Sequence, residues 1–212
     1  MNRINSFGMA GMVVLGLVLS GCSKSENPFI TSVDEELGAT LTSVRANMEG
    51  FTTELETIGT ALDGLQNKDL ELRAQYESFK KSAAEMKRVA EDLKLNRVAV
   101  NQACTSVLEK WQAGLDGLSD KKMRKRSTER LEDAIKEQKE LDQLMQKGDK
   151  MIDLYTATLT DISKYLDLEL SEDSVKSVSD AFKRARKSGN EINKWIEELL
   201  AELADLEKKF SV

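Results

Sequence analysis

The spacing of apolar residues at positions 175–210 constrains the fold more than any other feature of the sequence. An apolar or small residue recurs there in steps of three and four without interruption. The members of this series are Val175, Val178, Phe182, Ala185, Gly189, Ile192, Ile196, Leu199, Leu203, Leu206 and Phe210. Such steps place side chains on one face of an α-helix, and so regular a stripe predicts a coiled-coil seam. Because one helix cannot bury this stripe in water, the segment must pack against other helices.

Three earlier segments carry similar stripes and predict three more helices. The first holds Val33, Leu37, Val44, Met48, Phe51, Leu55, Ile58, Leu62 and Leu65, and it is interrupted by Gly64 and Asn67. The second holds Leu72, Tyr76, Phe79, Ala83, Met86, Ala90, Leu93, Val100, Cys104, Val107 and Trp111, and we expect it to end near Gly117. The third holds Met123, Leu131, Leu141, Met145, Ile152, Tyr155, Leu159, Ile162 and Leu166.

Capping residues mark where the later helices begin. Ser119 and Asp120 precede the third helix, and Ser171 precedes the fourth; their side chains suit a helix N-terminus. The only proline is Pro28, and aromatic residues make up 5% of the chain, which favours long helices over strands. We therefore predict an all-α protein, an elongated antiparallel helical bundle or coiled coil of about four long helices. The second and third helices should each have about 50 residues and be about 70 Å long.

The N-terminal segment predicts export and attachment to lipid. Arg3 precedes an apolar stretch at residues 7–19, followed by small residues, which is the pattern of a secretory signal. The segment ends in Leu19-Ser20-Gly21-Cys22, which resembles the lipobox of bacterial lipoproteins. That resemblance implies a diacylglyceryl group on the Cys22 sulfur and, after cleavage, an acyl chain such as palmitate on the freed amine. The alternatives are an ordinary secretory signal or a membrane-spanning helix, for which this stretch falls short of the ~20 residues needed.

These features divide the chain into three parts. We expect a lipoprotein signal peptide at residues 1–21, a lipidated tether at 22–29 and a helical coiled-coil bundle domain at 30–212. Two or three acyl chains, each buried methylene contributing ~0.8 kcal/mol, would hold the protein firmly on a membrane. In other lipoproteins an Asp after the cysteine favours retention in the inner membrane, whereas Ser23 stands here. We therefore expect the protein in the cell envelope, on the periplasmic face of the outer membrane.

The composition argues against several classes of function. The chain has no histidine, which removes the usual general base, metal ligand and triad partner. A net charge of -6 gives no reason to expect nucleic acid, whose binding depends on many cationic contacts to phosphates. Cys104 shares the apolar spacing of its helix, which indicates a buried structural residue rather than a catalytic thiol. We expect no enzyme activity, no small-molecule substrate, no metal and no cofactor other than the lipid on Cys22.

One stretch suggests contact with another molecule, because it is strongly basic. It begins the third helix and contains Lys121, Lys122, Arg124, Lys125, Arg126 and Arg130. Cations in a first turn oppose the helix dipole. Helices of alternating direction would return this hairpin to the anchored end, about fifteen residues or roughly 20 Å beyond the start of the first helix, a span that a six-residue tether could match. Contact with anionic lipid is one hypothesis; a solvated face paired with neighbouring acids is the alternative.

Two further groups of residues have simpler interpretations. Lys183, Arg184, Arg186 and Lys187 form a smaller basic group, which we expect to be solvated helix surface. Trp111 and Trp195 could anchor a partner, but Trp111 lies on an apolar spacing and Trp195 lies beside Ile196. Positions in the core or at the edge of a seam are therefore expected for both tryptophans.

Short motifs in the middle and C-terminal parts resemble the domain of unknown function 2959 family, which comprises bacterial predicted lipoproteins and secreted helical proteins. The resemblance covers residues 70–205. It depends on Leu108-Glu109-Lys110-Trp111 with Leu115, on Met123-Arg124-Lys125-Arg126-Ser127 with Leu131, and on Met145 with Lys150-Met151. The family's Leu-Lys-His-Asn-Leu-Asn stretch before the last helix is replaced by Leu166-Asp167-Leu168-Glu169-Leu170-Ser171. The resemblance implies a helical protein and brings no activity with it.

Together these features predict a lipid-anchored periplasmic coiled-coil protein with a structural, spacer or partner-binding role in the cell envelope. Its partners would be the membrane, through the anchor, and either an envelope protein or a second copy of the chain. The alternative is a peripheral membrane-surface module that uses its basic hairpin to bind anionic lipid.

Overall fold

The computed structural model describes residues 28–210, and it describes side chains between residues 35 and 206. The helices are α1 (Pro28–Gln66), α2 (Leu72–Asp116), α3 (Lys121–Leu168), α4 (Glu172–Ser177) and α5 (Ser179–Phe210). No strand occurs in this part of the chain, which confirms the all-α class. No helix among these residues is long and apolar enough to cross a membrane. The expected signal peptide and Cys22 lie outside the described residues.

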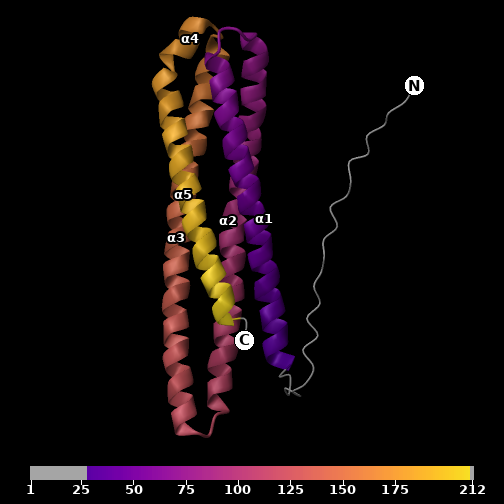
Figure 1. Ribbon diagram of the computed structural model, residues 1–212, viewed down its shortest axis with the longest axis vertical. Coiled ribbons are helices and arrows are strands. Elements are labelled where there is room, and N and C mark those ends of the chain that lie inside the picture. The colour runs from indigo at the N-terminus through magenta and orange to yellow at the C-terminus, as the bar shows by residue number, and fades with distance from the viewer. Residues whose placement is uncertain (1–27, 211–212) are drawn as a thin grey trace, which may run out of the picture.

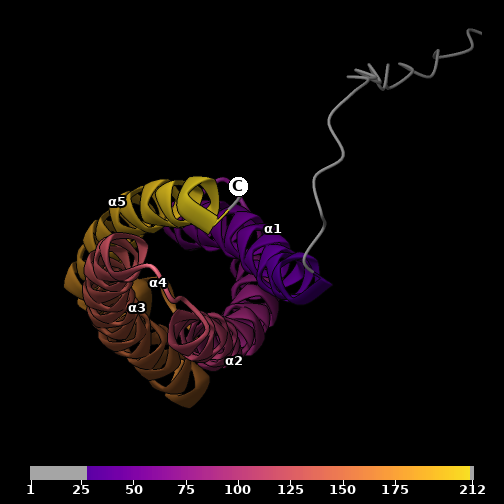
Figure 2. The same cartoon turned by 90° about the horizontal axis from the view of Figure 1, so that it is seen from below.

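The helices are arranged as a long rod in which the chain reverses direction at each end. α1 runs from the lower end to the upper end, α2 returns, α3 rises and α5 descends (Figure 1). Seen along the rod, these helices surround a common centre (Figure 2). α1 packs against α2 and α5, and α3 packs against the same two helices, so the ring is closed. The short α4 covers the upper end and contacts α1 and α3.

The apolar stripes face the centre of the ring and form one continuous core. Its largest fully buried side chains come from every long helix: Leu41, Met48, Phe51, Ile58, Leu62, Phe79, Met86, Ile152, Leu159, Ile162, Leu166 and Phe182. Burying an apolar side chain of this size contributes about 1.5–3 kcal/mol. Every core residue lies between Leu37 and Leu206. All of the core packing among the described residues therefore lies within residues 23–212.

α1 begins at Pro28, earlier than the expected start of the bundle at residue 30. Proline suits the first position of a helix, because the N–H that it lacks has no partner there. α1 then has 39 residues and α2 has 45, a difference of six. The expected excess of about fifteen residues was wrong. α2 extends past the start of α1 by about 9 Å rather than 20 Å.

The predicted single fourth helix is also wrong, because it is divided at Val178 into α4 and α5. Ser171 caps α4 as predicted, its hydroxyl oxygen accepting from the backbone N–H of Ser174 at 3.1 Å. Near the break, the Ser177 hydroxyl donates to the carbonyl of Asp173 at 2.8 Å. α4 turns across the end of the rod before α5 descends (Figure 1).

The lower end is a hairpin of α2 and α3 with a small core of its own. α5 ends well above the tip of this hairpin (Figure 1). Below that level the two helices bury Leu108, Leu115, Leu131 and Ala134, and the partly buried Trp111, Leu118 and Ile135 pack around them. The hairpin tip thus lies beyond the ends of both α1 and α5.

Candidate functional site

The loop at the hairpin tip is held by hydrogen bonds from its own residues. Asp120 is the N-cap of α3, and its Oδ1 accepts from the backbone N–H groups of Lys122 and Met123, each at 2.8 Å. Of the two predicted caps, the structure therefore uses Asp120. The Arg124 Nε donates to the carbonyl of Leu118 at 2.9 Å and ties the loop to the first turn of α3. These contacts give the tip a defined shape.

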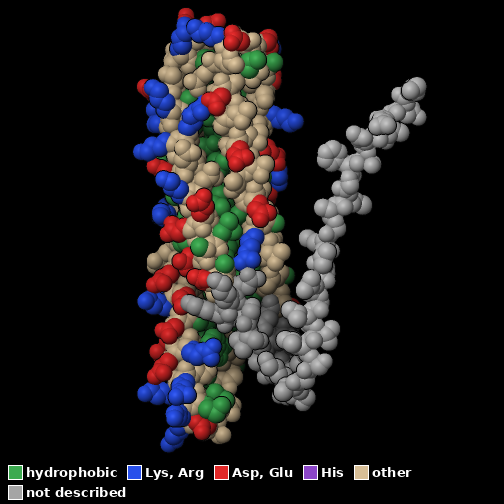
Figure 3. All heavy atoms as spheres, in the orientation of Figure 1, with side chains coloured by type: hydrophobic (Ala, Val, Ile, Leu, Met, Phe, Trp, Pro, Cys, Tyr) green, Lys and Arg blue, Asp and Glu red, His purple; other side chains and the backbone are tan. Residues whose placement is uncertain are grey.

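All six predicted cations are exposed at this tip, and basic side chains gather at the lower end of the rod in Figure 3. Some of them are engaged within the protein. Arg124 bonds to the loop, and the Arg130 guanidinium lies 5.7 Å from the centre of the Trp111 ring. The Lys125 Nζ lies 3.8 Å from the Glu129 Oε1, but both side chains are well exposed, so this pair contributes little.

The remaining three cations, Lys121, Lys122 and Arg126, have no acidic partner among the described side chains. Residues 117–130 contain six cations and two acids, a net charge of +4 in a chain whose total is -6. Met123 lies among these cations with 61% of its surface exposed. The tip therefore combines unpaired positive charge with an exposed apolar side chain.

The second basic group differs from the tip because three of its four cations form ion pairs with acidic side chains. The ion pairs are Lys183 with Asp180 at 2.9 Å, Lys187 with Glu191 at 3.8 Å, and Arg186 with Asp63 of α1. Charged side chains paired along an exposed face are ordinary helix surface. The expectation of a solvated surface is confirmed for Lys183, Arg184 and Lys187, which are exposed, whereas Arg186 is half-buried and pairs with α1.

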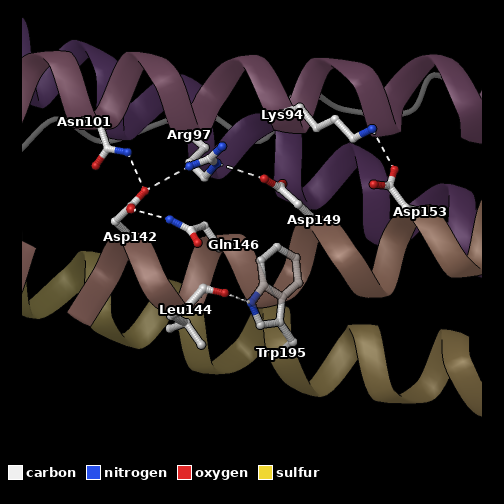
Figure 4. Close-up of polar contacts among 9 residues, drawn as sticks. All are labelled: Lys94, Arg97, Asn101, Asp142, Leu144, Gln146, Asp149, Asp153 and Trp195. Atoms are coloured by element: carbon white, nitrogen blue, oxygen red, sulfur yellow. Dashed lines mark hydrogen bonds and ion pairs between the residues drawn. The ribbon is translucent and has the colours of Figure 1, made fainter. Parts of the chain in front are cut away.

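Midway along the rod, a polar cluster joins α2 to α3 at the edge of the core (Figure 4). The Arg97 Nη1 lies 3.2 Å from the Asp142 Oδ1, and its Nε lies 2.8 Å from the Asp149 Oδ2. Asp142 also accepts from the side-chain amides of Asn101 at 2.5 Å and Gln146 at 2.7 Å. One guanidinium thus bridges two carboxylates that lie about two turns apart on α3.

The two carboxyl groups of this cluster have opposite pKa shifts. Burial alone would raise the pKa of Asp142, but hydrogen bonds from Asn101, Arg97 and Gln146 outweigh it and hold the pKa below its usual value. Burial dominates at Asp149 and raises its pKa, although Arg97 partly offsets the shift. Asp142 therefore favours folding when ionised, whereas ionisation of Asp149 opposes folding.

The two tryptophans lie at seams between helices. Trp195 is 4% exposed, and its Nε1 donates to the carbonyl of Leu144 at 2.8 Å. Trp111 is partly buried against the hairpin core, where its Nε1 donates to the Ser127 Oγ at 2.9 Å. The predicted core and seam-edge positions are confirmed, and each indole N–H has a partner inside the protein.

Sequence reasoning missed the polar cluster and a second polar contact at the core. Asn96 is 8% exposed, and its Oδ1 accepts from the Nδ2 of Asn47 on α1 at 3.0 Å. The available signal was a gap in the second stripe, which steps from Leu93 to Val100. Asn96 fills the position between them, where a buried polar pair can fix the register of two helices.

Cys104 is buried as predicted, with 1% of its surface exposed. Burial raises the pKa of its thiol to about 11, so almost none of it is the nucleophilic thiolate near neutral pH. Among the described residues, no group of three or more acidic or cysteine side chains is placed to hold a metal ion.

The described residues form an all-α rod that carries a basic surface at the end where α1 begins. The chain belongs to the family described as "Protein of unknown function (DUF2959)", which matches residues 30–210. This confirms the family resemblance and extends it over most of the chain. No curated protein matches the chain, and no solved structure does.

Proposed function

We propose that this protein is a lipid-anchored rod of the bacterial cell envelope, an antiparallel coiled coil of four long helices that spaces or connects envelope components. Acylated Cys22 would hold it on the periplasmic face of the outer membrane. The observation that carries this proposal is the place of Pro28 at the hairpin end of the rod. A lipid only six residues ahead of Pro28, a reach of at most about 20 Å, would keep that end near the bilayer.

The opposite end of the rod would then face away from the membrane. α2 has 45 residues and spans about 68 Å at 1.5 Å per residue. At the far end, Leu168 is 86% exposed and Leu70 is 44% exposed. A hollow of about 200 Å³ lies between the α1–α2 turn and α4, lined in part by Leu70 and Val175. Burial of the exposed Leu70 and Leu168 side chains would favour contact with a protein partner there.

Two measurements test this proposal. Mass spectrometry of the native protein should find diacylglyceryl and acyl groups on Cys22, and Cys22→Ala should release the protein from membranes. A photo-crosslinking residue at Leu168 should capture a defined envelope protein in cells. Leu154 is 67% exposed on α3, away from both helix ends, so a crosslinker there is the matched control. An unmodified Cys22, or the same products from both positions, would contradict the proposal.

A second candidate function is a peripheral membrane-surface module that binds anionic lipid. It is supported by the three tip cations that lack acidic partners in the described structure, Lys121, Lys122 and Arg126. Each basic side chain near an anionic surface contributes about 1 kcal/mol. Residues 23–212, prepared without acylation, should cosediment with vesicles that contain phosphatidylglycerol and stay in solution with vesicles of phosphatidylcholine alone. Equal cosedimentation with the two vesicle types would exclude this function.

A further inference from the structure

We propose that the hairpin tip docks on an anionic phospholipid bilayer by inserting Met123 between headgroups while Lys121, Lys122 and Arg126 contact the surrounding phosphates. This inference deepens the second candidate function and rests on it. It does not depend on acylation of Cys22. It assigns separate roles to residues that the sequence presents only as one basic run.

Met123 lies at the apex of the hairpin. It lies in the first turn of α3, at the extreme lower end of the rod beyond α5, and 61% of its surface is exposed. Met123 is not among the residues that form the hairpin core or pack against it. It is therefore an exposed apolar side chain at the apex of the hairpin. An unbranched thioether side chain suits an irregular apolar environment such as the headgroup boundary.

The cations of the tip differ in their contacts. Arg124 closes the loop through the carbonyl of Leu118, and Arg130 lies over the Trp111 ring. Lys121, Lys122 and Arg126 flank Met123 and make no ion pair within the described part of the chain. These three side chains are thus available to phosphate groups around an inserted Met123.

Two backbone N–H groups at the start of α3 already have a partner. Helix N-termini often bind phosphate through free backbone N–H groups, but Asp120 already accepts from the N–H groups of Lys122 and Met123. Recognition must therefore come from side chains, which carry charge without selecting one headgroup. Positive charge around an exposed apolar residue fits a bilayer surface, where phosphates surround an apolar interior.

The position of α1 adds a reason to choose a membrane as the occupant. α1 starts at the same end of the rod, and the tip extends past that start by about six residues or 9 Å. A bilayer approached by the N-terminal end of α1 therefore meets the hairpin tip first. With a lipid on Cys22, the rod would have two attachments, which would limit its tilt.

The test uses unacylated residues 23–212 and vesicles of phosphatidylcholine with phosphatidylglycerol. Lys121→Gln/Lys122→Gln/Arg126→Gln should lower the partition coefficient about 100-fold, given about fivefold for each cation near an anionic surface. The matched control is Lys183→Gln/Arg184→Gln/Lys187→Gln, which removes equal charge from exposed positions at the other end of the rod. That variant should bind within about twofold of the unmodified chain, because screening limits the reach of distant charges.

Insertion of Met123 is tested separately from the charge of Lys121, Lys122 and Arg126. Met123→Ser should weaken binding about fivefold, whereas Met123→Leu should preserve it. In Met123→Trp, brominated lipids should quench the added fluorescence, which they should not do for buried Trp195. Since Met123 is exposed, none of these changes should alter the circular dichroism of the chain.

The outcomes distinguish this inference from the function on which it rests. Loss of binding in the tip charge variant without any effect at Met123 would overturn insertion and leave electrostatic lipid binding intact. If neither the tip charge variant nor the changes at Met123 affect binding, both insertion and electrostatic lipid binding are excluded. Equally tight binding to heparin, insensitive to Met123, would show a general polyanion site and would also overturn the inference.

Discussion

The indole of Trp195 lies directly against the backbone of Gly148, so that a methyl group at position 148 would overlap the ring. The same ring donates its N–H to the carbonyl of Leu144, one turn earlier on α3. Glycine is costly in the middle of a helix, but here it makes the space that the indole fills. This contact fixes the relative position of α3 and α5.

Gly148→Ala should therefore destabilise the protein even though alanine favours helix. We expect the free energy of unfolding, measured by urea titration with circular dichroism, to fall by about 2–3 kcal/mol through overpacking. Gly50→Ala is the matched control, because open space surrounds the exposed Gly50 in α1; it should gain about 0.5–1 kcal/mol. A gain in stability at both positions would show that the packing of Trp195 does not require glycine at position 148.

The cluster around Arg97 should give opposite pH dependences for two aspartates. Because folding lowers the pKa of Asp142, its ionised form stabilises the protein above the unfolded pKa near 4, and that stability is lost as pH falls through the folded pKa. Asp142→Asn should thus cost about 1–2 kcal/mol at neutral pH, where its hydrogen bonds are charge-assisted. This cost should disappear in acid.

Asp149→Asn should behave in the opposite way. Folding raises the pKa of Asp149, so its ionisation above that pKa opposes folding, and the neutral amide should stabilise the protein at neutral pH. The gain should vanish below about pH 4, where the carboxyl is protonated in both states. Thermal unfolding of both variants between acid and neutral pH measures these effects. Parallel pH profiles for the two substitutions would contradict the assigned shifts.

The lower hairpin should open independently of the main bundle. Leu131 is 2% exposed and belongs to the small core shared by α2 and α3. Leu131→Ala should cost about 2–4 kcal/mol, mostly as local opening. Hydrogen exchange should then accelerate around residues 108–134 and change little in α5. Leu159→Ala, in the main core, is the comparison and should accelerate exchange throughout; uniform acceleration in both variants would mean that the hairpin is not a separate unit.

Cys104 should resist thiol reagents until the bundle opens. Its pKa of about 11, against about 8.5 for a free thiol, lowers the thiolate fraction at pH 8 by about 200-fold. Its burial slows access further. In residues 23–212 this is the only thiol, so reaction with an aromatic disulfide can be followed directly, with the urea-unfolded chain as reference. Equal rates for folded and unfolded protein would show that Cys104 is accessible.

Much of the fold could be predicted because its signals are local. The apolar stripes predicted the long helices, and Asp120 and Ser171 were recognised as caps because capping depends on the next few residues. The break at Val178 was missed because the apolar spacing continues through it. The departure of Val178 from helical dihedral angles leaves no mark on that spacing.

The candidate site was likewise predicted only in part. The six cations were visible as a run in the sequence, but their different contacts were not. Arg124 is engaged by a carbonyl of the loop and Arg130 by a ring on α2, and both contacts depend on how the hairpin closes. Arg126 is also an arginine, yet it has no such contact among the described residues, and neither has Lys122.

The sequence by itself determined that this chain is helical, that its helices bury narrow apolar stripes, and where most of them start and stop, because helix periodicity and capping act over a few residues. Only the tertiary structure decided that Gly148 receives Trp195, that Arg97 bridges Asp142 and Asp149, and that Met123 lies exposed beyond the end of α5. These relationships join residues far apart in the chain or at different levels of the rod. They depend on the register between helices, and that register follows from the packing of the whole bundle.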